Sequence, residues 1–171
     1  MGDSTVYPNV ENVRVLSWNV LAQQLTYNME DGRRVSAFEQ VKDEYLEWKH
    51  RAPLFKQEFF KRDDKTGELF WDVICMQEFT CHKELFEGQV DGYVGVLMEN
   101  GNKWTNAIYY NPAKFTLKAQ REAKYKDPQT GENQGQGFVS VQLQCKRSQI
   151  SFHVYTTHLK AKKGFERVRE N

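Results

Sequence analysis

The order of apolar segments along the 171-residue chain predicts a mixed α/β fold. Two strand-like segments, VRVLSWNV at 13–20 and FWDVICMQEF at 70–79, flank a helical stretch at 36–62. A long helical crossover is the usual connection between parallel strands, so we expect these two strands to pair in parallel. Strand candidates then follow one another with short connections, which favours antiparallel pairing. The sequence therefore predicts a mixed sheet with crossover helices.

The helical stretch has a start signal and an internal break. Ser36 followed by Glu39 resembles a capping box, which predicts that a helix begins there. Apolar residues recur at helical spacing after it: Phe38, Val41, Tyr45 and Trp48. Pro53 cannot donate a helical hydrogen bond, so we expect it to split or kink the segment.

Strands dominate the chain after residue 90. The candidates are YVGVLME at 93–99, NAIYY at 106–110, FTLKAQ at 115–120, FVSVQLQC at 138–145 and ISFHVYTTHL at 150–159. Residues 82–90 suggest a short helix, and the turn-rich residues 124–137 suggest a loop. The expected helices are too few to cover two sheets. The sequence shows no linker or repeat, so residues 1–171 are interpreted as one domain or part of one.

Composition excludes several classes of protein. Apolar residues make up 39% and charged residues 27% of the chain, which is typical of a globular domain and not of a disordered one. The net charge of +1 argues against a strongly basic protein that coats nucleic acid. The three cysteines show no CxxC spacing, which argues against a disulfide framework or a zinc site. We find no signal peptide and no membrane-length apolar run, and expect a cytoplasmic protein with no membrane partner.

Polar side chains close two of the apolar strands. Asn19 ends the first strand, where asparagine is as often a turn residue as a functional one. Glu78 ends VICMQE, and a carboxylate leaving a buried strand is costly unless it is paired, solvated or bound to a metal. An exposed strand terminus is the simpler interpretation of Glu78 alone. Together, an amide and a carboxylate oxygen could hold a hard cation such as Mg2+.

A histidine and several lysines close a third strand. His158 could act as an acid or base, or could donate a hydrogen bond to a phosphate oxygen. Lys160 and Lys162 follow it closely, and lysines on loops are usually only solvated. At the carboxyl end of a strand they also suit an anionic ligand. The three strand ends together therefore predict one site for a metal and a phosphate.

These same segments carry a family resemblance. LSWNVLAQ, ICMQE and TTHLKAKKGFERVR, in this order, resemble the endonuclease/exonuclease/phosphatase superfamily, in its nocturnin and carbon-catabolite-repression deadenylase branch. The match runs from about Val13 to Arg169. The resemblance implies a DNase-I-like two-sheet α/β sandwich, of which this chain would be the N-terminal half.

The resemblance also implies roles for individual residues. Asn19 and Glu78 match the metal site, with Glu78 a direct ligand of Mg2+ or its substitute Mn2+. His158 matches the histidine on the phosphate side, and Lys160 a basic residue that faces the substrate. Lys162 stands where relatives usually have arginine, which binds phosphate bidentately. The segment before NAIYY lacks the acidic residue and glycine of the family, so we assign no role to it.

The family's second half has Asp-x-Asn and Ser-Asp-His motifs, and neither occurs in this sequence. We therefore expect the chain alone to be nearly inactive, although its family hydrolyses phosphoesters. Two substrates fit the resemblance, namely the 2′-phosphate of NADP(H) and the 3′ end of RNA. An alternative is a non-catalytic fragment that binds nucleotide or protein, with no obligate protein partner evident. Another is that half a sandwich does not fold alone, because one sheet would lack its partner and expose an apolar face.

Overall fold

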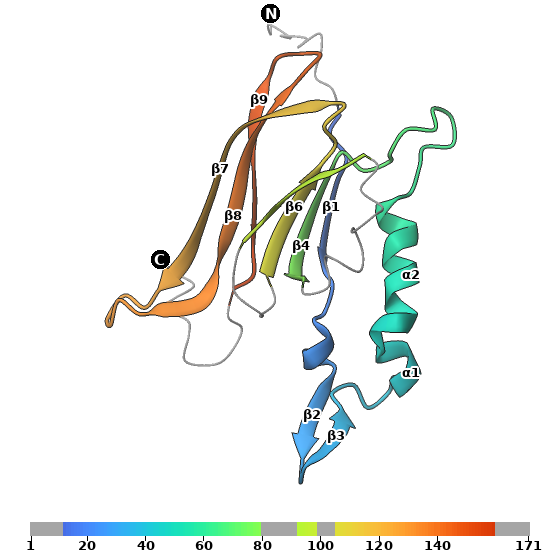
Figure 1. Cartoon of the computed structure of the whole chain (residues 1–171), viewed down its shortest axis with the longest axis vertical. Coiled ribbons are helices and arrows are strands. Elements are labelled where there is room, and N and C mark those ends of the chain that lie inside the picture. Colours follow the sequence, from blue (N-terminus) through green and yellow to red (C-terminus); the bar gives the residue numbers. More distant parts are fainter. Residues whose placement is uncertain (1–11, 80–91, 99–104, 160–171) are drawn as a thin grey trace, which may run out of the picture.

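Two β-sheets pack face to face, and a helix lies against the outer side of the first sheet (Figure 1). This computed structural model describes residues 12–79, 92–98 and 105–159. The arrangement confirms the predicted mixed α/β class. The candidate helix at 82–90 lies outside the described residues.

The first sheet is mixed. Its strands, in spatial order, are β1 (Val15–Asn19), β4 (Val73–Phe79), β6 (Thr105–Tyr110) and β5 (Val94–Leu97). β1 pairs with β4 in parallel, and both other pairings are antiparallel. The parallel pair is the one that the sequence predicts across the helical crossover. It brings the ends of β1 and β4 to the same edge of the sheet, with Asn19 in register with Gln77.

The second sheet is antiparallel and contains longer strands than the sequence predicts. It consists of β7 (Phe115–Lys126), β8 (Asn133–Cys145) and β9 (Ser151–Thr157) in that order. The predicted loop at 124–137 is wrong over most of its length, because pairing between β7 and β8 continues to Lys126 and Asn133. The connection is a short turn in which Asp127 Oδ1 accepts the N–H groups of Gln129 and Thr130. Its polar composition reflects an exposed hairpin end.

The helical region begins later than predicted. α1 spans Asp43–Leu46 and α2 spans Trp48–Phe59, with an extended residue, Glu47, between them. The break therefore lies at Glu47, and Pro53 sits inside α2 without ending it. The capping box is wrong because Ser36 ends a strand, and its hydroxyl accepts the N–H of Phe38 in a local turn.

A small hairpin precedes these helices and was not predicted. β2 (Tyr27–Glu30) and β3 (Arg33–Ser36) pair antiparallel after a 3-10 turn, η1 (Gln23–Leu25). Asp31 and Gly32 both have positive φ, 48° and 76°, as a two-residue type I′ turn requires. The Asp-Gly pair was the available signal, but the flanking residues lack a clear apolar alternation.

The first core layer lies between the first sheet and α2. Phe55 and Phe59 of α2 contact the outer face of the sheet, where Ile74 and Met76 are fully buried. Trp18 packs edge-on against Phe55, with ring centroids 5.0 Å apart. Aromatic residues of the helix thus cover the face of β1 and β4 that points away from the second sheet.

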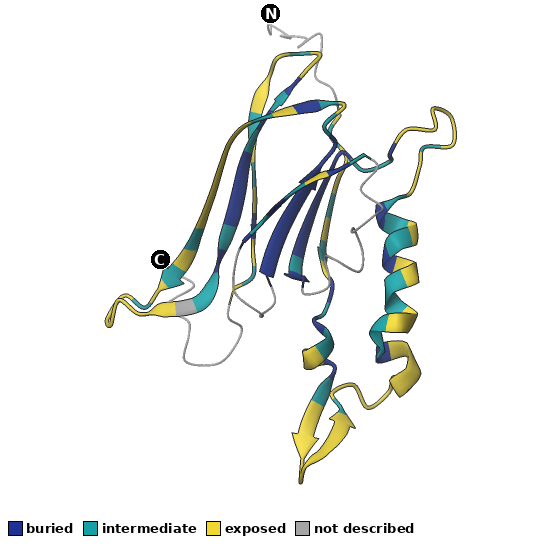
Figure 2. Cartoon of the chain, in the orientation of Figure 1, coloured by how far each residue is buried: buried dark blue, intermediate teal, exposed yellow. Residues whose placement is uncertain are grey.

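The second core layer lies between the two sheets. Figure 2 shows buried residues concentrated on the strands at the centre of the molecule. Val73 and Ile108 of the first sheet pack with Val139, Val141 and Leu143 of β8. The expectation that one sheet would lack its partner is therefore wrong, because the chain contains both facing layers.

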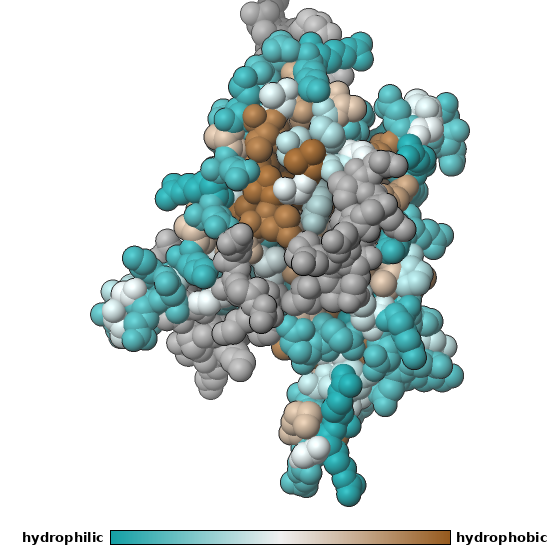
Figure 3. All heavy atoms as spheres, viewed as in Figure 1, coloured by the Kyte–Doolittle hydropathy of each residue, from teal (hydrophilic) through white to brown (hydrophobic). Residues whose placement is uncertain are grey.

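The sandwich is less well covered elsewhere. On the second sheet, the outward-facing Tyr155 of β9 is 63% exposed. Apolar side chains also reach the surface between the sheets (Figure 3), beside a hollow that Val96, Leu97 and Val139 line together with Gln120 and Glu122. The prediction of too few helices agrees with this pattern across the residues that the structure describes.

Within the described ranges, no helix has the length and apolar character needed to cross a membrane.

Asp72, the residue before β4, links the start of this strand to the segment before β1 and to the segment between β6 and β7. It is 1% exposed, and its carboxylate accepts the Arg14 N–H at 2.9 Å and the Lys114 ammonium at 2.8 Å. Its carbonyl accepts the N–H of Asn111, where the chain turns from the first sheet to the second. One buried acid therefore fixes the start of β1 and the crossing between sheets.

We predict that Asp72→Ala lowers the free energy of unfolding by about 2–4 kcal/mol, since it leaves a buried N–H and an ammonium without their acceptor. Urea denaturation of the chain measures this. Glu68→Ala is the control, because Glu68 is exposed and only 3.9 Å from the same lysine, and such pairs contribute under about 1 kcal/mol. Equal losses in both variants would contradict a special role for Asp72.

Candidate functional site

Asn19 closes β1 and serves both as a turn residue and as a partner of Glu78. Its Oδ1 accepts the N–H of Leu21 at 2.9 Å, which is the Asx-type turn that the residue favours. Its Nδ2 donates to Glu78 Oε1 at 2.9 Å. Leu21 has a positive φ of 54°, so the chain turns sharply after the strand. Asn19 is therefore both a turn residue and a member of the candidate site, because the turn leaves its amide nitrogen facing the Glu78 carboxylate.

Glu78 lies in a bulge at the end of β4. In a regular strand, Phe79 would face the second sheet with Val73 and Cys75, but it packs with Ile74 in the helix-side core. The register shift between Met76 and Phe79 produces this change, and Glu78 takes a φ of 56° within it. The bulge turns the Glu78 side chain toward the end of β1.

Glu78 is 6% exposed, and three groups contact its carboxylate. Asn19 Nδ2 donates to Oε1, and the buried N–H of Ala22 donates to Oε2 at 3.0 Å. His158 Nε2 lies 3.3 Å from Oε1. The prediction of an exposed strand terminus is wrong, because Glu78 is buried and bonded to groups from two other parts of the chain.

His158 follows β9 directly and reaches the site from the second sheet. Its side chain is 30% exposed, so part of the ring is accessible to solvent. The structure thus brings Asn19, Glu78 and His158 together at one rim of the sandwich. Lys160 and Lys162 lie outside the described residues, and their place relative to this rim stays a prediction.

Arg51 of α2 holds the loop behind Asn19 and was not identified from the sequence. Its guanidinium donates to the carbonyls of Val20 at 2.8 Å and Leu21 at 2.9 Å, and to Gln23 Oε1 at 3.0 Å. Another nitrogen donates to Leu46 O at 3.0 Å. The rigid fork of an arginine suits several carbonyls at once. A basic residue in the first turn of a helix gives no sequence signal for such a role.

A partly buried hydrogen bond joins the two sheets next to the site. Gln77 Nε2 donates to Thr156 Oγ1 at 2.7 Å, and Thr156 is 3% exposed. Gln77 precedes Glu78, and Thr156 stands two residues before His158. Both are polar residues on otherwise apolar, inward-facing strand positions, which was the available signal for them.

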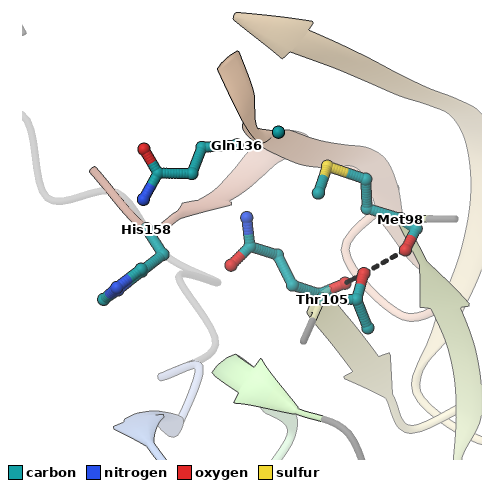
Figure 4. A pocket seen from close by; sticks show the side chains of 6 residues that line it. Met98, Thr105, Gln136 and His158 are labelled. Carbon is teal, nitrogen blue, oxygen red and sulfur yellow. Dashed lines mark hydrogen bonds between the residues drawn. The ribbon is translucent and has the colours of Figure 1, made fainter. Parts of the chain in front are cut away.

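A small hollow opens beside His158. Figure 4 shows Gln136 and His158 lying on one side of it and Met98 and Thr105 on the other, with a hydrogen bond from the Thr105 hydroxyl to the Met98 carbonyl. Asn106 also lines it and donates to the Gly137 carbonyl at 2.8 Å. No role was predicted for this segment of β6, yet its first residues, Thr105 and Asn106, line the hollow beside His158.

The donor groups fit a weakly held divalent cation. The described residues contain no group of three or more His, Cys, Asp or Glu side chains placed to hold a metal. Mg2+ does not require one, because it often binds one or two carboxylates and completes its octahedron with water and phosphate. Glu78 supplies one carboxylate, while Asn19 points its nitrogen at Glu78 and its oxygen at Leu21. The arrangement fits Glu78 as the ligand and favours Asn19 as the residue that orients it.

The two described cysteines do not contribute reactive thiols to the site. Cys75 and Cys145 are buried and free, and Cys81 lies outside the described residues. Burial raises the pKa of the Cys75 thiol to about 11, so that thiol stays protonated at neutral pH and is a poor nucleophile.

Comparisons with known proteins agree with this fold. No family model matches the chain. Nocturnin from Rattus norvegicus is 26% identical over 170 residues, which cover 92% of this chain and 36% of the rat protein. The human nocturnin catalytic domain with a bound sulfate anion superposes with a TM-score of 0.66 and 24% identity, covering 92% of this chain and 53% of that one.

A second solved structure, ANGEL2, is a 2′,3′-cyclic phosphatase in complex with adenosine-2′,3′-vanadate. It superposes with a TM-score of 0.63 and 22% identity, covering 85% of this chain and 41% of that one. The chain therefore spans about half or less of the length of these relatives. It has the fold of part of a DNase-I-like sandwich, and its sequence is similar to the nocturnin branch of the endonuclease/exonuclease/phosphatase proteins.

Proposed function

We propose that this chain forms the metal- and phosphate-binding part of a Mg2+-dependent phosphoester hydrolase of the nocturnin and deadenylase type. The observation that carries the proposal is the meeting of Asn19, Glu78 and His158 at one rim, from three separate strand ends. A left-handed φ at Glu78 adds support, because strained residues of this kind cluster at functional sites.

Glu78 is the proposed metal ligand, and Asn19 and the Ala22 N–H hold its carboxylate in place. Bound Mg2+ would supply positive charge to the phosphoryl oxygens and to the leaving oxygen. Asn19 contributes by fixing the carboxylate rotamer, which a lone glutamate at a strand end would not keep. Arg51 supports it in turn by fixing the carbonyls of the loop after β1.

His158 is proposed to donate a hydrogen bond to a phosphoryl oxygen from the accessible part of its ring. Lys160 and Lys162 are proposed to bind the same phosphate, on the strength of the sequence motif alone. Lysine binds phosphate as a point charge, so this pair would position the substrate less rigidly than the arginine that relatives usually carry at the second position.

The proposed substrate class is an adenine nucleotide whose phosphoester involves the ribose 2′ or 3′ oxygen. Both open candidates, the 2′-phosphate of NADP(H) and the 3′ end of RNA, belong to it. The adenosine-2′,3′-vanadate held by ANGEL2 has the same chemistry. The net charge of +1 favours the smaller substrate, since phosphate contacts dominate the affinity for long nucleic acids.

We predict that Glu78→Gln weakens Mg2+ binding to the chain by at least about tenfold, or about 1.4 kcal/mol, because it removes the charged ligand. Isothermal titration with Mg2+ measures this, and Mn2+ gives a second reading. The control is Glu30→Gln in the exposed β2–β3 hairpin, which should bind like the native chain. Native affinity in Glu78→Gln would rule out the metal assignment.

We predict that the 171-residue chain alone hydrolyses neither NADPH nor a poly(A) oligonucleotide, since no described or sequence-matched residue activates the attacking water. Phosphate release and oligonucleotide shortening are the two assays. Strong turnover of either substrate would contradict the assignment of the missing motifs.

A longer protein that joins this chain to Asp-x-Asn and Ser-Asp-His motifs should release phosphate from NADPH faster than it shortens poly(A). Faster shortening of poly(A) than release of phosphate from NADPH would favour RNA as the substrate.

If the chain binds neither Mg2+ nor nucleotide, it is a non-catalytic module.

A further inference from the structure

The two halves of the proposed site come from different sheets. Asn19 and Glu78 belong to the first sheet, where backbone pairing fixes β1 against β4, and Val20 N–H donates to Gln77 O at 3.0 Å. His158 belongs to the second sheet. Among the described strands no backbone ladder joins the two sheets, so we expect side chains to set the separation between Glu78 and His158.

Most side chains between the sheets are apolar. On β4, Val73 and Cys75 face the second sheet, and Gln77 is the next residue on that side. On β9, Phe152 and Val154 face the first sheet, and Thr156 is the next. The Gln77–Thr156 hydrogen bond therefore joins the next pair of inward-facing positions after the apolar contacts, at the rim where the site lies.

An apolar contact and a hydrogen bond constrain the sheets differently. Apolar side chains tolerate small shifts, whereas an amide-to-hydroxyl bond fixes both a distance and a direction. The Gln77–Thr156 bond is 2.7 Å long and partly buried, and it lies one residue from Glu78 and two from His158. A second bond between the sheets, from Asn106 to Gly137 O, joins β6 to β8 and not the two strands that carry the site.

We propose that the Gln77–Thr156 hydrogen bond positions His158 against Glu78 by fixing β9 relative to β4. Gln77 and Thr156 are thus positioning residues that act through Glu78 and His158. The significance of this contact for phosphate binding rests on the function proposed above, but its geometric claim can be tested without metal or substrate.

The geometric test is the interaction free energy between Glu78 and His158, measured by a double-mutant cycle of Glu78→Gln and His158→Gln in urea denaturation. The cycle is run in the native chain and again in Gln77→Met, whose side chain keeps the shape but loses the donor. We expect the interaction to fall by at least half in Gln77→Met. Thr156→Val should lower this interaction free energy in the same way, whereas Thr156→Ser, which keeps the hydroxyl, should leave it at its native value.

Matched controls separate this role from general destabilisation. Gln144→Met removes a hydrogen bond from Gln144 to Gln149 O at the far end of β8, and Thr116→Val removes an exposed hydroxyl from β7. Neither should change the Glu78–His158 interaction, even if stability falls. An unchanged interaction in Gln77→Met and Thr156→Val would overturn the proposal.

The functional test uses Mn2+ and inorganic phosphate as probes. In Gln77→Met we expect Mn2+ affinity within about twofold of native, because Glu78 remains, and phosphate affinity in saturating Mn2+ reduced about tenfold, in the range usual for residues that orient ligands. Native phosphate affinity in Gln77→Met would also overturn the proposal. Failure of the native chain to bind Mn2+ would instead reject the proposed function, and the cycle above would still decide the positioning role.

Discussion

The buried carboxylate of Glu78 is the constraint on which the arrangement of the site depends. A carboxylate taken out of water is costly unless donors replace the lost hydration. Here the donors are the side chain of Asn19 and the backbone of Ala22, and the ring of His158 lies 3.3 Å from the same carboxylate. Because β1, β4 and β9 lie far apart in sequence, contacts to one carboxylate bring the ends of β1 and β9 to the end of β4.

The bulge in β4 makes this possible, and it has a cost. A left-handed φ at a residue other than glycine costs on the order of 1–3 kcal/mol. The surrounding structure offsets it, because the shift lets Phe79 bury its ring in the helix-side core, where it is fully buried, while Gln77 still faces the second sheet. The bulge therefore lets three consecutive side chains point in three directions. Gln77 points toward Thr156, Glu78 toward the rim and Phe79 toward the core beneath α2.

The sequence predicts the elements whose structure follows from the burial of apolar runs. It does not predict features that depend on the tertiary contacts of a single side chain. Strands β1 and β4, their parallel pairing and the polar residues at their ends follow from apolar runs and a long crossover. The bulge at Glu78 does not, since VICMQEF reads as an unbroken strand and only tertiary packing places Phe79 in the helix-side core. The same holds for Arg51, whose role depends on carbonyls brought to it by the β1 loop. The loop predicted at 124–137 was wrong over most of its length because turn-forming residues also occur at the exposed end of a long hairpin.

The donor set also bears on how the proposed metal and phosphate would bind. Glu78 supplies a single carboxylate, and both of its oxygens already accept hydrogen bonds. A cation held by one such ligand keeps most of its coordination positions for water and phosphate oxygens, which is the usual condition of protein-bound Mg2+. In the proposed complex, phosphate would supply ligands to the cation, and the cation would supply charge to the phosphate. By linkage each must strengthen the binding of the other by the same factor. A site of this composition would hold either ligand weakly alone, and the separation between Glu78 and His158 would determine how strongly the two bind together.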